Sequence, residues 1–142
     1  MNGIPFRIVK ITIDNFSIDN DAKVCNDAPL DIESNFSFGV DMEGHVVKCD
    51  SEYEFVFDSK TILSLRIGSF FEIELEAFND FYNSKREFVI SKDFLRYMAT
   101  ICVGTARGII IAKSENTPIA NVVLPPLNLM EAIKDDFIIP SV

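Results

Sequence analysis

The first half of the chain alternates apolar and polar residues with the period of a β-strand. Phe6–Ile18 is rich in Ile, Val, Phe and Thr, contains no Gly or Pro, and predicts a long strand. Phe36, Phe38 and Val40 alternate with Ser37, Gly39 and Asp41, which predicts a second strand with one apolar face. Further strands are expected at residues 53–57, with a continuation through 61–67, and at 70–78. Residues 19–34 are polar, contain Pro29 and predict a connecting loop.

In the strand expected at 70–78, one face is acidic. Glu72, Glu74 and Glu76 alternate with apolar residues, so they would form a ladder of like charges. Two interpretations stay open, an ordinary solvated face or a docking face for a basic partner. Phe36, Phe38 and Val40 likewise fit either simple core packing or a binding surface.

The period changes to that of a helix after Ser91, a plausible N-cap. The helix is expected to run to about residue 113, and only Arg96, Thr100 and Arg107 form a polar stripe on it. One sheet covers one side of a helix, so the remaining apolar circumference predicts self-association. The expected interface consists of Met98, Cys102, Gly104, Gly108, Ile109 and Ile110. A second, shorter amphipathic helix is expected at 127–137, after Pro125 and Pro126.

Composition bounds the class of protein. The chain has 142 residues, 48% of them hydrophobic, which is enough for one folded domain spanning 1–142 without disulfides or a metal. The net charge of -9 disfavours nucleic acid and anionic membranes as partners and favours a basic one. The acidity lies in residues 1–90, which hold 17 acidic and 8 basic residues. A mean hydropathy of +0.19 beside this charge suggests an oligomer interface or a binding groove.

The sequence has few groups suited to catalysis. Cys25, Cys49 and Cys102 are widely spaced, which is typical of reduced thiols in a cytoplasmic protein, and no export signal or membrane span is expected. His45 is the only histidine and follows a turn-like Glu-Gly pair, where a solvated side chain is expected. No phosphate loop, nucleophile motif or metal-ligand pattern occurs. We therefore expect no enzymatic activity, no cofactor and no metal.

Several segments together resemble the SecB family of export chaperones. The opening FRIVKITIDNFSID is similar to the first strand of that family, FSFGVD to its second, and the proline pair before Asn128 to the lead into its final helix. The resemblance covers most of the chain and implies an α+β fold, with an antiparallel sheet of about four strands followed by one long and one short helix. It also implies a dimer or a tetramer built as a dimer of dimers.

The resemblance further implies a function. Members of the family bind unfolded polypeptides without ATP and pass precursors to the export motor SecA through acidic residues. Carried over, Asp19 and Glu74 match acidic docking positions, which Glu72 and Glu76 would extend. The client groove would be formed by apolar residues of the second strand and of the last helix with its lead-in, namely Phe36, Phe38, Val40, Leu127, Leu129, Ile133 and Phe137.

The chain also departs from the family pattern. Asn15 stands where the family often has an acid, Glu72 stands where it has an apolar residue, and no acidic tail follows Pro140. These departures weaken the expectation of motor docking more than that of a chaperone. The alternative within the same fold is a chaperone dedicated to one partner such as an antitoxin. A small-molecule enzyme of the hot-dog type is a remote alternative, because its helix comes early in the chain.

Overall fold

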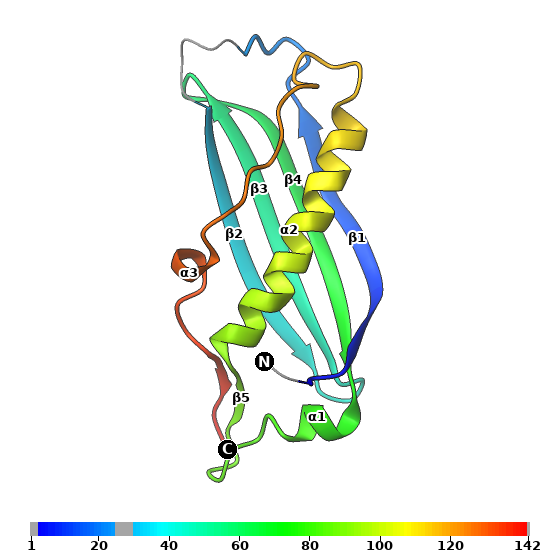
Figure 1. Cartoon of the computed structure of the whole chain (residues 1–142), viewed down its shortest axis with the longest axis vertical. Coiled ribbons are helices and arrows are strands. Elements are labelled where there is room, and N and C mark those ends of the chain that lie inside the picture. The colour runs from blue at the N-terminus through cyan, green and yellow to red at the C-terminus, as the bar shows by residue number, and fades with distance from the viewer. Residues whose placement is uncertain (1–2, 25–29, 142) are drawn as a thin grey trace.

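The structure, a computed structural model, describes residues 3–24 and 30–141, and in these a long helix crosses one face of an antiparallel sheet (Figure 1). The four long strands are β1 (Phe6–Ile18), β2 (Leu30–Asp41), β3 (Val46–Phe57) and β4 (Lys60–Ile73). Their order in the sheet is β1-β4-β3-β2, so β1 and β2 are the edges. Asp58 and Ser59, both with positive φ, form the tight turn between β3 and β4.

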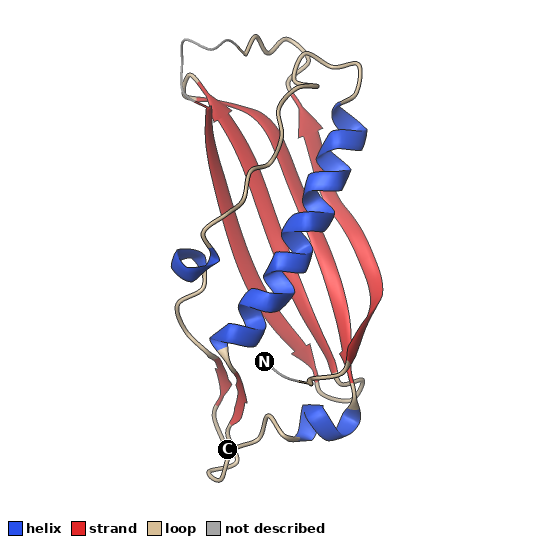
Figure 2. Cartoon of the chain, viewed as in Figure 1, coloured by secondary structure: helices blue, strands red, loops and turns tan. Residues whose placement is uncertain are grey.

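The remaining elements follow the sheet. Helix α1 (Leu75–Asn79) leads to β5 (Phe88–Ile90), the long helix α2 (Lys92–Ser114), helix α3 (Leu129–Ala132) and β6 (Phe137–Ile139). Strands β5 and β6 pair with each other in a small second sheet (Figure 2). Four antiparallel strands followed by a long and a short helix confirm the α+β fold that the resemblance to SecB implied.

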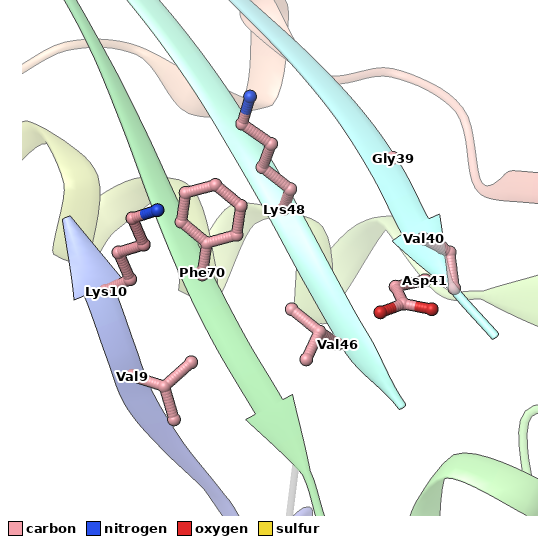
Figure 3. Close-up of a pocket in the computed structure, with 8 residues that line it drawn as sticks. All are labelled: Val9, Lys10, Gly39, Val40, Asp41, Val46, Lys48 and Phe70. Atoms are coloured by element: carbon pink, nitrogen blue, oxygen red, sulfur yellow. The ribbon is translucent and has the colours of Figure 1, made fainter. Parts of the chain in front are cut away.

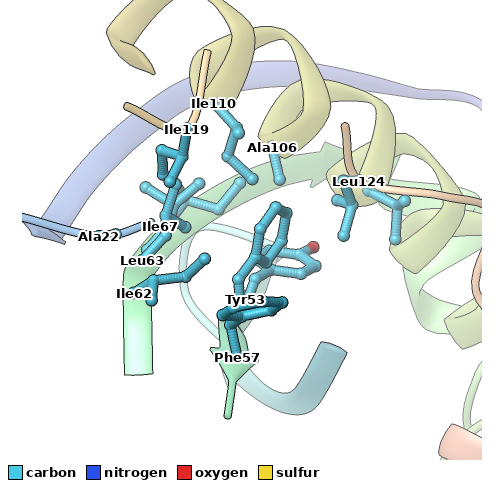
Figure 4. Close-up of a cluster of buried hydrophobic side chains, with 13 residues drawn as sticks. Ala22, Tyr53, Phe57, Ile62, Leu63, Ile67, Ala106, Ile110, Ile119 and Leu124 are labelled. Atoms are coloured by element: carbon cyan, nitrogen blue, oxygen red, sulfur yellow. The ribbon is translucent and has the colours of Figure 1, made fainter. Parts of the chain in front are cut away.

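The core lies between the sheet and α2. In β3 every second residue from Val47 to Phe57 is buried, because these side chains face α2 while their neighbours face outward. We call the α2 side of the sheet its inner face and the opposite side its outer face. Figure 4 shows the part of this core under the C-terminal half of α2, where Tyr53, Leu63 and Ile67 of the sheet lie beneath Ala106 and Ile110.

Three of the expected elements need correction. The strand expected at 70–78 ends at Ile73, and α1 takes over two residues later. The helix expected at 127–137 is reduced to the single turn of α3, and Phe137 belongs to β6. The loop expected at 19–34 is shorter because β2 begins at Leu30, and its residues 25–29, with Cys25 and Pro29, lie outside the described part of the chain.

Candidate functional site

Helix α2 has three distinct stripes of side chains. One is buried on the sheet and includes Phe94, Met98, Cys102, Ala106 and Ile110. Length and composition alone would allow α2 to cross a membrane, but its packing on the sheet explains its apolar character without one. Its first turn is fixed by Ser91, whose Oγ accepts a hydrogen bond from the amide of Phe94 at 3.2 Å.

The second stripe, with Arg96, Thr100, Val103 and Arg107, holds the end of the chain. Arg107 donates from Nε to the carbonyl of Leu124 at 2.6 Å and from Nη2 to that of Pro125 at 3.1 Å. Arg96 donates from Nε to the carbonyl of Ile133 at 2.9 Å. Residues 119–133, which we call the C-terminal segment, therefore run along α2. Apart from the single turn of α3 their backbone is irregular, so its carbonyls need donors (Figure 1).

An open groove of about 490 Å³ lies between this stripe and the C-terminal segment. Its lining is mostly aliphatic and comprises Thr100, Val103, Arg107, Val123, Leu124, Pro125, Pro126, Leu127 and Leu129. The Arg107 side chain is committed to two carbonyls of the segment. The groove therefore offers apolar surface and little directional bonding, which suits sequence-tolerant binding of apolar side chains.

Phe36, Phe38 and Val40 lie on the inner face of the edge strand β2, all half-buried. In register they oppose Ser51, Cys49 and Val47 of β3 respectively, whose side chains are buried. The Phe36 ring meets the ring of Tyr53 edge-on at 6.1 Å. The three side chains thus have the half-exposed position on the inner face that a client surface needs, beside α3.

The four residues expected to form the opposite wall lie in three different places. Leu127 and Leu129 line the groove, and Leu129 also packs against the same core clusters as Phe36. Ile133 is buried in the core, so it offers no free surface. Phe137 is half-buried in β6, where it pairs with Ile90, away from the groove-lining residues.

The acidic residues do not form one surface. Asp19 follows the end of β1, at the β1 end that pairs with the start of β4, and Glu72 lies at the other end of β4. Glu72 bonds the guanidinium of Arg7 at 2.8 Å. Glu74 is the N-cap residue of α1 and Glu76 lies in its first turn, so the predicted ladder on one strand is wrong. Asp19 pairs with Lys60 at 2.9 Å, and this hydrogen bond lowers the pKa of the Asp19 carboxyl.

The third stripe of α2, with Tyr97, Ile101, Gly104, Gly108 and Ile111, is uncovered. Its Tyr97 ring lies 5.8 Å from the Phe6 ring of β1, and further along α2, outside this stripe, Lys113 Nζ lies 5.3 Å from the Phe16 ring. Between these two contacts, three inner-face side chains of β1 are more than two-fifths exposed, namely Ile8, Ile11 and Ile13. We call this stripe and these isoleucines the open flank.

The open flank corrects the expected interface. Met98, Cys102 and Ile110 are fully buried inside one chain and have no surface left for another copy. Ile109 is half-buried. Gly104 and Gly108 are exposed, and a Cβ at either would meet no atom within 4 Å. Of the residues expected at the interface, Gly104 and Gly108 are the exposed ones, and they lie on the same stripe of α2 as Tyr97, Ile101 and Ile111.

Sequence reasoning missed a buried polar cluster beneath α2. Ser51, Tyr53 and Ser69 are buried, and their hydroxyls have no hydrogen-bond partner among residues 3–24 and 30–141. Burial raises the pKa of Tyr53. The neighbouring thiol of Cys102, together with burial, raises the pKa of Cys49, so Cys49 stays protonated. His45 is partly buried, with Nδ1 at 2.6 Å from the carbonyl of Ile73, in place of the solvated turn expected.

Groups suited to bond-breaking do not gather at the groove. Within residues 3–24 and 30–141, no three His, Cys, Asp or Glu side chains lie together as a metal site requires. The only polar side chains lining the groove are Thr100, which bonds to the carbonyl of Arg96 at 2.8 Å, and Arg107. The groove can bind apolar side chains of a polypeptide, but its lining includes no side chain placed to act as an acid, a base or a nucleophile.

Comparison with known proteins gives similarity at the level of fold. No protein-family model matches the chain, and no curated protein matches it. A protein of unknown function from Streptococcus agalactiae is 16% identical, with a TM-score of 0.49, over 87% of this chain and 99% of that one. A SecB-like chaperone from Mycobacterium tuberculosis, solved with a peptide from an antitoxin, is 11% identical, with a TM-score of 0.46, over 87% and 91%. Both TM-scores lie below 0.5, so the function proposed below rests on the geometry of this chain.

Proposed function

We propose that this protein is an ATP-independent chaperone of the SecB type, which holds non-native polypeptide segments in the groove between α2 and the C-terminal segment. The observation that carries the proposal is the groove itself, whose lining is aliphatic apart from Thr100 and Arg107. Burial of client side chains there is favourable at about 25 cal/mol per Å² whatever their sequence. Phe36, Phe38 and Val40 extend this apolar surface across the inner face of β2.

We further propose that the working form is a homo-oligomer in which a second copy covers the open flank. Exposed isoleucines on β1 lie beside an exposed helix stripe that contains two glycines. Glycines allow the backbone of another helix to approach closely. The second copy would also cover the free edge of β1, which otherwise presents unpaired backbone groups.

The holdase proposal is tested by polar substitution in the groove. Val123, which is 52% exposed, and Leu127 are both replaced by Ser, and suppression of aggregation of a chemically reduced, unfolded client is measured by light scattering. We expect a several-fold higher chaperone concentration for half-suppression, because the client loses apolar contact area in the groove. The matched control is Ile138→Ser, since Ile138 is 54% exposed but lies on β6. Equal loss in the control, or none in the groove variant, would contradict the proposal.

A second candidate, a chaperone dedicated to one partner, is favoured over delivery to the export motor by the position of the acidic residues. Asp19 and Glu72 lie at opposite ends of the sheet and each is paired with a cation. The four expected docking residues are therefore spread over both ends of the sheet. Mass spectrometry of chains that co-purify from the native cell distinguishes the candidates, since a general holdase carries many clients and a dedicated one carries a single partner.

The acidic positions still allow a direct test of motor docking. Reversal of Glu74 and Glu76 to Lys leaves the groove untouched, because both lie at the start of α1. If Asp19, Glu72, Glu74 and Glu76 do dock a basic motor, binding at low salt is strong for the native chain and is lost in this variant. Unchanged binding, or none by the native chain, supports the dedicated-partner alternative.

A further inference from the structure

The outer face of the sheet carries a feature that the groove on the inner face does not explain. Phe70 of β4 has Lys10 of β1 and Lys48 of β3 as its direct cross-strand neighbours. The two ammonium groups lie 5.5 and 5.2 Å from the centre of the Phe70 ring (Figure 3). In a chain with a net charge of -9, two cations thus flank one aromatic ring.

A pocket of about 380 Å³ opens beside this row of side chains. A register shift between Ile8 and Lys10 leaves Val9 unpaired, and Val9 lines the pocket together with Lys10. On the other side, Gly39 of the edge strand leaves space, since a Cβ there would meet no atom within 4 Å. Val46 and the Phe70 ring add apolar surface to the lining.

The charges in and around this pocket favour a single anionic group. Lys48 pairs with Asp50 at 3.1 Å, whereas Lys10 forms no ion pair with any residue of the described part of the chain. Asp41 also lines the pocket, but its Oδ1 accepts the amides of Glu43 and Gly44. A single carboxylate bound between the two lysines would be attracted by both ammonium groups, while a run of carboxylates would be repelled by Asp14, Asp41 and Asp50.

We propose that this pocket is a second polypeptide-binding site, which takes an extended segment with one Asp or Glu and an aliphatic residue two positions away. Alternate residues of a strand lie about 6.6 Å apart. Lys48 and Val46 are also two positions apart on β3 and both line the pocket. A segment along the strands therefore places its carboxylate between Lys10 and Lys48 and its aliphatic side chain against Val46 and Val9.

The occupant is a polypeptide because the pocket lies open on the face of a sheet. Sites for small molecules enclose most of their ligand, whereas an extended chain gains further contacts along the strands beyond the pocket. The inference deepens the proposed function, since it gives the partner a chemical character. Apolar parts of the partner would occupy the groove, and an acidic segment would occupy the outer face.

The test uses a fluorescent, end-blocked peptide that contains Glu-Ser-Leu between Gly-Ser spacers, and measures its binding to the full chain by anisotropy. In the double variant Lys10→Gln, Lys48→Gln we expect the dissociation constant to rise about tenfold, as the loss of two partly exposed charge contacts implies. A peptide with Gln in place of Glu should bind the native chain equally weakly and be insensitive to the lysine changes. Binding of the Glu peptide should also weaken as salt is raised.

The matched control is Lys113→Gln, because Lys113 also lies over an aromatic ring, that of Phe16, but on the inner face. This control should bind the Glu peptide within about twofold of the native chain, a change below 0.5 kcal/mol. Unchanged binding by the double lysine variant, or loss of binding on Leu127→Ser, would overturn the outer-face site. Suppression of client aggregation, measured on the same variants, reports on the groove separately, so a failed outer-face site leaves the proposed function standing.

Discussion

The two flanks of α2 differ in what covers them. On the flank toward β2, Arg96 and Arg107 bind backbone carbonyls and hold the C-terminal segment against the helix. On the open flank, toward β1, the helix presents Tyr97, Gly104 and Ile111 with no segment of the described chain over them. The arginine donors hold the chain's own C-terminal segment over one flank. The glycines and exposed isoleucines of the other flank suit it to being covered by a second copy of the chain.

The largest expected effect separates the buried stripe from the open flank. Ile110 is fully buried and its neighbour Ile111 is 47% exposed. Ile110→Ala should lower the free energy of unfolding by about 3 kcal/mol, through lost burial and a cavity. Ile111→Ala should change the free energy of unfolding of the dissociated chain by no more than about 0.5 kcal/mol. Urea unfolding of both variants provides the measurement, and equal losses in dilute protein would show that the two stripes are not distinct.

The next largest expected effect concerns the flank of α2 toward β2, which the C-terminal segment covers. Arg107→Met removes both donors to Leu124 and Pro125, and should destabilise the packing of the C-terminal segment by about 2 kcal/mol. Hydrogen exchange of residues 119–129 should accelerate accordingly. The control is Arg66→Met, since the Arg66 pair with Glu52 at 3.4 Å is exposed on the sheet and contributes little. If exchange is unchanged in Arg107→Met, the segment is held by its apolar contacts alone.

The two arginines also show what the sequence could predict. Apolar spacing predicted α2 within a residue or so at either end, because every turn of a buried helix repeats the pattern. Arg96, Thr100 and Arg107 were interpreted as a narrow polar stripe. Their role as donors depends on irregular backbone 17 to 37 residues further along the chain, and local periodicity carries no information about such contacts.

The same limit applies to the candidate site. The inner-face position of Phe36, Phe38 and Val40 follows from strand alternation and was predicted. Glu72, Glu74 and Glu76 do not form the predicted ladder on one strand, because β4 ends at Ile73 and the last two of them belong to the start of α1. A strand and a short helix were indistinguishable over those residues, since the apolar positions that follow Ile73 suit either. Ile133 and Phe137 were misplaced for a similar reason, as one helical turn and a short strand replaced a longer helix.

A smaller effect tests whether a second copy closes the open flank. Gly104→Ala and Gly108→Ala should each stabilise the dissociated chain by about 1 kcal/mol, because alanine favours the helix and a Cβ there has free space. The same changes should weaken self-association, measured by sedimentation, if another backbone approaches the glycines closely. Gly39→Ala, in a strand with equally free space, is the control for self-association. Unaltered association in both helix variants, or a native chain that sediments as a monomer at micromolar concentration, would contradict closure by a second copy.

The smallest effect concerns how β1, the strand of the open flank, is anchored at its end. Asp19 donates its amide to the carbonyl of Ile62 at 2.9 Å and its carboxylate pairs with Lys60. The hydrogen bond with Lys60, and the one from the Asp21 amide, lower the pKa of the Asp19 carboxyl from its ordinary value of 3.8. A carboxyl with a lowered pKa stabilises the fold above that ordinary value, and the contribution is lost as pH falls through the lowered pKa. Thermal melts of Asp19→Asn should therefore show a slightly lower Tm than the native chain near neutral pH, and the two should converge in acid. A constant difference at every pH would assign the effect of Asp19→Asn to lost turn geometry, and the ion pair would then contribute nothing to the anchoring of β1.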